Sequence, residues 1–310
     1  MSKIIKRIFS STGIYWSMFY FLSKTKIDRF ISDKKYLSLL YRCLMSKKLN
    51  LENPQTFNEK IQWLKLYYRN PIYHYLVDKA SVKQIVAEKI GRQYVIETIG
   101  VWDRFEDIII EDLPNQFVLK TTHSGGNSGV VICKDKSQFD IKVAKLKLNK
   151  SLKESSYWPG REWPYKSIKP RIIAEPYLSD NSEANHEGLT DYKFSCFNGM
   201  ADNVMVCIDR HIGDTKFYFF DKSWNLLRIN KRGLEAPKGF TLPKPEKIDE
   251  MFDVASKLSE GFPYSRVDLY YVNNKVYFGE ITFFPDSGFD SNLLPITDEY
   301  IASKIILKKY

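Results

Sequence analysis

The chain has 310 residues, of which 44% are hydrophobic and 15% aromatic, and no repeat at a fixed period is visible. This length and composition allow a large buried core and exclude disordered, fibrous and solenoid proteins. Lysine and arginine outnumber aspartate and glutamate by 47 to 37, and the net charge of +10 suits an anionic partner. No RRM, KH or zinc-finger signature is present, so nucleic acid ranks last among the possible anionic partners.

The first 30 residues contain a short apolar and aromatic run between basic flanks, and the run is shorter than the ~20 residues needed to span a bilayer. Two interpretations stay open for it: a helix that lies on an anionic membrane surface, or an ordinary packed helix. No secretory signal precedes the four widely spaced cysteines, which we expect to be buried thiols. We therefore expect a cytoplasmic protein, with peripheral contact at the inner membrane face through residues 1–30 as one alternative.

Residues 1–75 are predicted to form a helical N-terminal region. Within it, Asn58–Tyr68 places Ile61, Leu64 and Tyr68 on one helical stripe. Pro71 interrupts this pattern. A second helix is then predicted over Asp78–Lys89, because Gly91 supplies a stop signal directly after it.

Short β-rich runs separated by turn signals follow, and Asn198-Gly199 between two of them is the strongest short hairpin signal in the chain. One further helix is predicted over Lys247–Ser259, before Gly261. The fold class is therefore α+β. Strands are predicted at Gln116–Thr121, Gly129–Cys133, Arg171–Glu175, Asp191–Phe197, Met200–Ile208, Lys216–Phe220, Arg266–Val272 and Val276–Phe283.

A glycine-containing loop joins the first two predicted strands, and Lys120 ends the strand before it. Glycines let backbone N–H groups approach phosphate oxygens, and a lysine on the preceding strand supplies a point charge. The pattern is neither a Walker sequence nor GxGxxG, so a plain hairpin tip explains it equally well. His123 beside the glycines fits either a phosphate contact or a hydrogen-bonded turn.

The last two predicted strands carry acidic residues in a pattern of period two. Arg266 and Asp268 share one face, as do Glu280 and Thr282. A three-residue turn over 273–275 sets Asp268 opposite Glu280, whereas a two-residue Asn273-Asn274 turn sends the acids to opposite faces. Pairing of the two acids therefore requires a bulged or three-residue loop. Two adjacent carboxylates with open coordination positions suit Mg²⁺; the alternative is a set of surface cross-strand charges.

The strand that begins at Asp191 and the strand after it carry a further group of charged side chains. Asp191 and Lys193 share parity and can face one cleft, and Arg210 ends the return strand after the Asn198-Gly199 turn. A solvated face with alternating charges is the plainer interpretation.

Taken in order, these residues resemble the ATP-grasp superfamily, and more narrowly its teichuronopeptide-biosynthesis (TupA-like) family. The resemblance covers roughly residues 50–295 and is carried by TFNEKIQWLK, VDK, GVWD, LPNQFVLKTTHSGG, PRIIAEPYL, DYKFSCFNG, RVDLY and FGEITFFP. It implies an ATP-grasp fold of two α/β lobes clasping a nucleotide, with a helical N-terminal extension. The implied domains are 1–75, the N-lobe with the glycine loop at 76–178, and the C-lobe with the metal site at 179–310.

The resemblance also implies roles for individual residues. Lys193, Arg210 and Arg266 would neutralise the transferred phosphoryl group and the oxyanion. ATP would be bound by Lys79, Lys120, His123, Ser124, Gly125, Gly126, Glu175, Tyr177, Leu178 and Asp191, with Glu175 and the residues after it at the adenine hinge. Asp268, Glu280 and Thr282 would ligate Mg²⁺, although many relatives carry Asn where Thr282 stands.

The activity implied is ATP-dependent ligation of a carboxylate to an amine through an acyl phosphate. The partners implied are an acidic sugar or polysaccharide precursor and an amino acid or other amine, in the biosynthesis of a bacterial capsule or cell-surface polysaccharide. A glycosyltransferase on the same polymer is the alternative, but the chain has no DxD pair to hold its metal. A non-catalytic module that keeps the fold is the third hypothesis.

Overall fold

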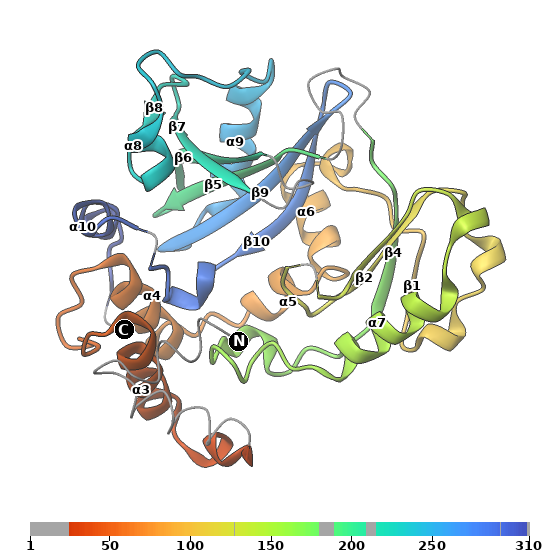
Figure 1. The fold of residues 1–310 in the computed structure, drawn as a ribbon, viewed down its shortest axis with the longest axis horizontal. Helices are drawn as coiled ribbons and strands as arrows, with labels where there is room; N and C mark the ends of the chain where they lie inside the picture. The colour runs from red at the N-terminus through yellow and green to blue at the C-terminus, as the bar shows by residue number, and fades with distance from the viewer. Residues whose placement is uncertain (1–24, 127, 180–188, 209–214, 292, 309–310) are drawn as a thin grey trace. The chain divides into compact units, whose positions relative to one another are not determined.

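The computed structural model describes residues 25–126, 128–179, 189–208, 215–291 and 293–308 (Figure 1). The chain falls into two compact units, one made of Met1–Asn70, Tyr157–Trp163 and Phe284–Tyr310, the other of Pro71–Ser156 and Pro164–Phe283. The boundaries predicted after residues 75 and 178 stay predictions. Within the described ranges, no helix combines the length and the apolar character needed to span a membrane. The apolar N-terminal run, for which a membrane-surface helix or a packed helix was predicted, lies outside the described residues.

The first unit is helical; α3 (Asp33–Met45) and α4 (Phe57–Tyr67) lie in the region predicted to be helical, whereas α10 (Pro295–Ser303) was not predicted. Helix α4 begins with a capping box, in which the Thr56 side chain accepts from the Glu59 backbone N–H and the Glu59 carboxylate accepts from the Thr56 N–H. The inner face of α3 packs in a small apolar core.

Three polar side chains on one face of α4 organise a turn far away in the sequence. Asn58, Gln62 and Lys65 are spaced at i, i+4 and i+7 and are almost fully buried. Each donates a hydrogen bond to a carbonyl of residues 287–290, at 2.8–2.9 Å. The polar positions of the NEKIQWLK motif are therefore explained by the fold of this unit.

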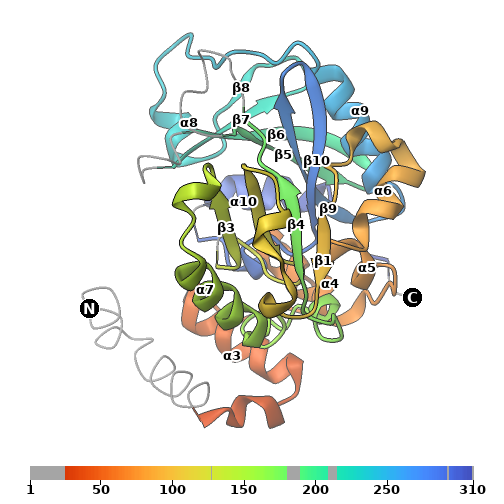
Figure 2. The same cartoon turned by 90° about the vertical axis from the view of Figure 1, so that its right-hand side faces the viewer.

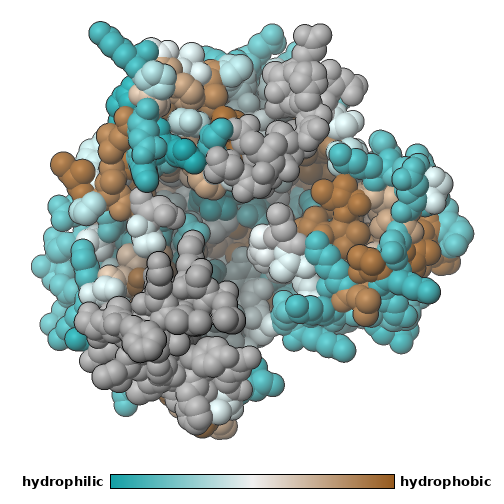
Figure 3. All heavy atoms as spheres, viewed as in Figure 1, coloured by the Kyte–Doolittle hydropathy of each residue, from teal (hydrophilic) through white to brown (hydrophobic). Residues whose placement is uncertain are grey.

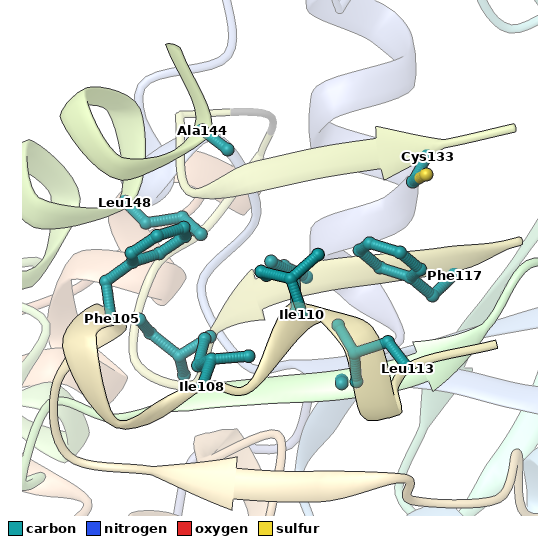
Figure 4. Packing of buried hydrophobic residues seen from close by; sticks show 11 residues of the cluster. Phe105, Ile108, Ile110, Leu113, Phe117, Cys133, Ala144 and Leu148 are labelled. Atoms are coloured by element: carbon teal, nitrogen blue, oxygen red, sulfur yellow. The ribbon is translucent and has the colours of Figure 1, made fainter. Parts of the chain in front are cut away.

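The second unit contains a four-stranded antiparallel sheet in the order β1-β4-β2-β3 (Figure 2). Its strands are β1 (Gly100–Trp102), β2 (Phe117–Thr121), β3 (Val130–Cys133) and β4 (Ile172–Pro176). Helix α7 (Ile141–Lys153) covers one face, where Ala144 and Leu148 point into a core that includes Phe117 (Figure 4). Lys120 and Glu175 stand on the other face, because side chains alternate along each strand.

The same unit contains a six-stranded antiparallel sheet in the order β10-β9-β5-β6-β7-β8. Its strands are β5 (Asp191–Phe197), β6 (Met200–Ile208), β7 (Lys216–Asp221), β8 (Leu226–Leu227), β9 (Tyr264–Val272) and β10 (Lys275–Thr282). Helix α9 (Ile248–Ser259) packs on one face of the sheet, and the polar side chains of the candidate site stand on the other. The remaining helices of the unit are α5 (Tyr73–Val77), α6 (Val82–Ile90) and α8 (Lys231–Glu235).

All eight predicted strands are present, as are the helices predicted over Asn58–Tyr68, Asp78–Lys89 and Lys247–Ser259. The Asn198-Gly199 turn is also confirmed, with both residues at positive φ. Strands β1 and β8 and helix α7 were not predicted. The four cysteines are buried thiols, as predicted.

Candidate active site

The final hairpin brings its two acids together on one face. Asp268 on β9 lies directly opposite Glu280 on β10, and Arg266 lies directly opposite Thr282. This is the predicted pairing. Asp268 is also directly opposite Lys193 of β5, so its carboxylate stands between two neighbouring strands.

The way the chain achieves this register differs from the predicted turn. Lys275 pairs with Val272, so the loop is the two-residue Asn273-Asn274 turn, with both residues at positive φ. The predicted bulged or three-residue loop is therefore wrong. A two-residue turn alone would place the acids on opposite faces. The register shift lies instead between Phe278 and Glu280, where Gly279 forms a bulge inside the strand.

Asp268 is compensated by two cations. Arg266 Nε and Nη2 donate to its two oxygens at 2.7 and 2.9 Å, and Lys193 Nζ donates to Oδ2. Burial alone would raise the pKa of Asp268, but the two cations outweigh it and hold the pKa below its ordinary value. The pKa of Arg266 is raised, because its attraction to Asp268 outweighs its own burial. With only 3% of the Asp268 side chain exposed, the alternative of exposed surface charges fails for this residue.

Glu280 is the more accessible acid, with 37% of its side chain exposed. Lys79 Nζ lies 3.8 Å from one of its oxygens, and Arg266 Nη2 lies 3.5 Å from the other. Arg266 also donates to the Thr282 hydroxyl at 3.2 Å. Lys79 donates in addition to the Ser124 carbonyl at 2.5 Å, which joins the stem of the glycine loop to the acidic hairpin.

The predicted face of β5 is also present. Lys193 Nζ lies 3.9 Å from Asp191 Oδ2, and both side chains are buried next to Asp268. Arg210, predicted to complete this group, lies outside the described residues.

A second charged cluster stands on the four-stranded sheet and contains a lysine that we did not predict. Glu175 on β4 receives Lys120 Nζ on one oxygen and Lys83 Nζ on the other, each at 2.6 Å. Burial would raise the pKa of Glu175, but the two lysines outweigh it and lower the pKa. Burial also lowers the pKa of Lys83. Its position four residues after Lys79, one turn into a predicted helix, was the available signal.

The glycine loop has an ordered stem and an open tip. In the stem, the Thr121 hydroxyl is 2.6 Å from that of Ser124 and 2.8 Å from that of Ser151 at the end of α7. A Cβ at Gly129 would overlap this group of hydroxyls, so the glycine is required there. Gly125 and Gly126 are exposed, and nothing lies within 4 Å of a Cβ built on either. The exposed tip is the part that a phosphate group can approach.

His123 and the residues that follow β4 are the remaining residues predicted to contact ATP. The His123 ring is buried, with Nε2 3.0 Å from the Glu154 carbonyl, and burial lowers its pKa. A turn histidine is thus present, and its predicted contact with ATP stays a prediction. Tyr177 and Leu178 are half-buried where the chain leaves β4 after Glu175. Their predicted place at the adenine hinge is not tested by these contacts.

The donor set fits a magnesium ion that is completed by phosphate. Among the described residues, no three His, Cys, Asp or Glu side chains gather to hold a metal by themselves. Asp268 and Glu280 supply hard oxygen ligands on one face, and Thr282 adds a hydroxyl beside them. Magnesium is commonly held by one or two carboxylates, with water and substrate phosphates as its other ligands. The lysines and arginine around the acids are the groups that a triphosphate needs.

Comparisons with known proteins identify the family of the chain. The family model described as TupA-like ATPgrasp matches residues 59–306. Among solved structures, D-alanine–D-alanine ligase from Helicobacter pylori is 14% identical with a TM-score of 0.43, covering 80% of this chain and 69% of that one. The ATP complex of the Bacillus anthracis enzyme is 17% identical with a TM-score of 0.41, covering 74% and 62%. D-cycloserine synthetase DcsG is 14% identical with a TM-score of 0.42, covering 76% and 72%.

The search of curated proteins found no significant match. The chain spans less than two thirds of the Bacillus anthracis ligase, so substrates do not transfer from that enzyme. The family match is the decisive finding, because it covers most of the 310 residues and includes every site residue described above. The chain belongs to the TupA-like ATP-grasp family and is an ATP-dependent ligase with ATP and Mg²⁺ as its cofactors.

Proposed function

We propose that the protein joins a carboxylate to an amine through an acyl phosphate. One observation carries the proposal: two acids of the last hairpin share a sheet face with Lys193 and Arg266, and Lys79 Nζ lies 3.8 Å from Glu280. Such a group can hold a metal–triphosphate and offset the negative charge that develops as a phosphoryl group moves.

The reaction balances in two steps. A substrate carboxylate oxygen attacks the γ-phosphorus of ATP, the bond from that phosphorus to the β–γ bridging oxygen breaks, and ADP leaves. The amine nitrogen then attacks the acyl carbon, a tetrahedral oxyanion forms and collapses, phosphate leaves and the amine loses a proton. A bound magnesium ion supplies charge neutralisation at the phosphates. This scheme requires no covalent nucleophile from the protein.

The residues divide this work by position. Asp268 and Glu280 hold the metal, with Thr282 acting directly or through a water. Lys193 and Arg266 would face the transferred phosphoryl group and the oxyanion, and Arg210, which lies outside the described residues, is proposed to act with them. Lys79 and Lys120 bind the phosphates, and the tip of the glycine loop covers them and excludes water from the acyl phosphate.

The substrate half of the proposal is an acidic sugar or uronic-acid-containing polysaccharide precursor as the carboxylate and an amino acid or other amine as the nucleophile. The net charge of +10 supports an acidic substrate. The setting we propose is the cytoplasm, with peripheral contact to the inner membrane face through residues 1–30, where a cell-surface polymer is built.

The test is ADP release from ATP and Mg²⁺ with pools of uronates and amines, followed by mass measurement of the product. Hydroxylamine in place of the amine should give a hydroxamate if an acyl phosphate forms. Glu280→Gln should lose both signals. Turnover of a UDP-sugar without ADP release would replace the ligase with a glycosyltransferase, and nucleotide binding without turnover in any pool would leave a binding module.

A further inference from the structure

We propose that the outer face of α7 docks on the anionic surface of a lipid bilayer. This face is defined by Lys142, Val143, Leu146, Lys150 and Lys153, all of them exposed. The proposal is separate from the ligase activity and from any contact made by residues 1–30.

The helix has two faces that its packing distinguishes. Ala144 and Leu148 point into the core beside the sheet (Figure 4), and Ser151 is buried as well. The residues about half a turn away therefore point outward. Leu146 stands near the centre of the outward side and is 74% exposed, and Val143 beside it is 59% exposed. Figure 3 shows hydrophobic atoms exposed among hydrophilic ones on the side of the view where the four-stranded sheet lies in Figure 1.

The charge of this helix has one sign. Its thirteen residues include five lysines and no acid, which is half of the net charge of +10. Glu106 pairs with Lys145 at the flank, and Glu154 reaches only to 4.0 Å from Lys150. The centre of the outer face therefore keeps a strong positive field.

The apolar residues decide between two anionic partners. A hydrated polyanion, such as an acidic polysaccharide, would use the lysines and leave Val143 and Leu146 without a role. A bilayer uses both, because apolar side chains enter the acyl boundary while lysines meet the anionic headgroups. The lysine stems can lie along the same boundary with their charges in the headgroup layer. The pairing of exposed apolar and basic residues on one face thus favours lipid.

The test measures sedimentation of the full chain with vesicles of phosphatidylcholine alone and with added phosphatidylglycerol. The triple variant Lys142→Gln/Lys150→Gln/Lys153→Gln should bind the anionic vesicles at least tenfold more weakly, since each lysine contributes about fivefold. The control Lys222→Gln/Lys238→Gln/Lys244→Gln removes the same charge from exposed positions elsewhere and should have a much smaller effect. Because both variants keep residues 1–30, any contact made there cancels in the comparison.

A second variant tests the apolar part without changing charge. Val143→Gln/Leu146→Gln should weaken binding to the anionic vesicles several-fold. Circular dichroism and ATP titration should show that this double variant and the Lys142/Lys150/Lys153 triple variant stay folded. Equal losses in the triple variant and its control would overturn the proposal. Loss with the lysine variant but none with the apolar pair would also overturn it, and would assign the face to a hydrated polyanion.

Discussion

Gly279 is the residue on which the register of the acidic hairpin depends, and replacing it with alanine tests the proposed metal site. The bulge at Gly279 restores the pairing of Asp268 with Glu280 after the two-residue turn. A Cβ built at this position would lie 3.0 Å from the Asp268 carbonyl oxygen and 3.1 Å from the Tyr270 ring. The substitution therefore pushes on the backbone of Asp268, one proposed metal ligand, and lies one residue before Glu280, the other.

The size of the effect follows from these distances. Both contacts are a few tenths of an ångström too short, so the carbonyl or the ring must move by about that amount. Overpacking of this kind costs ~1–3 kcal/mol in the free energy of unfolding. Since small displacements of positioning groups are costly at a reacting centre, we expect Mg²⁺-dependent ATP affinity to fall by roughly tenfold. ATP binding without Mg²⁺ should change little.

The assay is titration of ATP with and without Mg²⁺, together with urea unfolding. The matched control is Ile281→Val, which lies on the same strand but on the buried reverse face. It should cost ~0.5–1.5 kcal/mol in stability and leave Mg²⁺-dependent binding unchanged. Tyr270→Leu in the alanine background should recover part of the affinity, because it removes one of the two close contacts.

Wild-type Mg²⁺ dependence in a folded Gly279→Ala protein would refute the reasoning. So would an equal loss in the Ile281→Val control, since the effect would then follow stability rather than ligand geometry.

Three further predictions concern the charged groups. Asp268→Asn should lower the free energy of unfolding by about 3 kcal/mol, because Lys193 and Arg266 lose their closest counter-charge and keep only Asp191 and Glu280 at 3.9 and 3.5 Å. Glu280→Gln should keep the fold and lose Mg²⁺-dependent ATP binding, so urea unfolding and nucleotide titration separate the two variants. Lys83→Met should cost roughly 1.5–3 kcal/mol in stability and weaken ATP binding in the same assays, because Glu175 then keeps only Lys120. The pKa values of Asp268 and Glu175 are lowered in the folded protein, so their contribution to stability is complete above the unfolded-chain pKa of about 4 and is lost as the pH falls through the folded-state values. The urea midpoint of unfolding should therefore drop at acid pH. Glu175→Gln should make that drop smaller.

The sequence was sufficient for the elements with a strong local signal. The eight predicted strands carry β-rich runs between turn signals, and the Asn198-Gly199 hairpin needs only two residues to be recognised. Helix α7 was missed because its outer face carries Val143 and Leu146 among lysines, so its apolar residues form no single stripe. Strand β1 has three residues and pairs with β4, seventy positions later, a contact with no local signature.

The candidate site shows the same division between local and distant information. Parity along each strand was enough to group Arg266 with Asp268 and Glu280 with Thr282. Parity could not show where in the hairpin the residue that shifts the register lies, because an extra turn residue and a bulge at Gly279 shift the register by the same amount. Lys83 was missed because its partner Glu175 is ninety-two positions away, and only the packing of α6 near β4 joins them.

The acids of the candidate site are compensated by the same cations that the proposed reaction would use. Asp268 receives Lys193 and Arg266, and Glu280 has Lys79 nearby. A metal ion bound by these carboxylate oxygens would displace part of that cation shell, and the displaced cations would then need a new anion. A triphosphate would supply it, since its oxygens can both complete the metal shell and receive the lysines and the arginine. At the proposed site, metal and nucleotide would therefore each favour binding of the other, because together they keep the buried charges compensated.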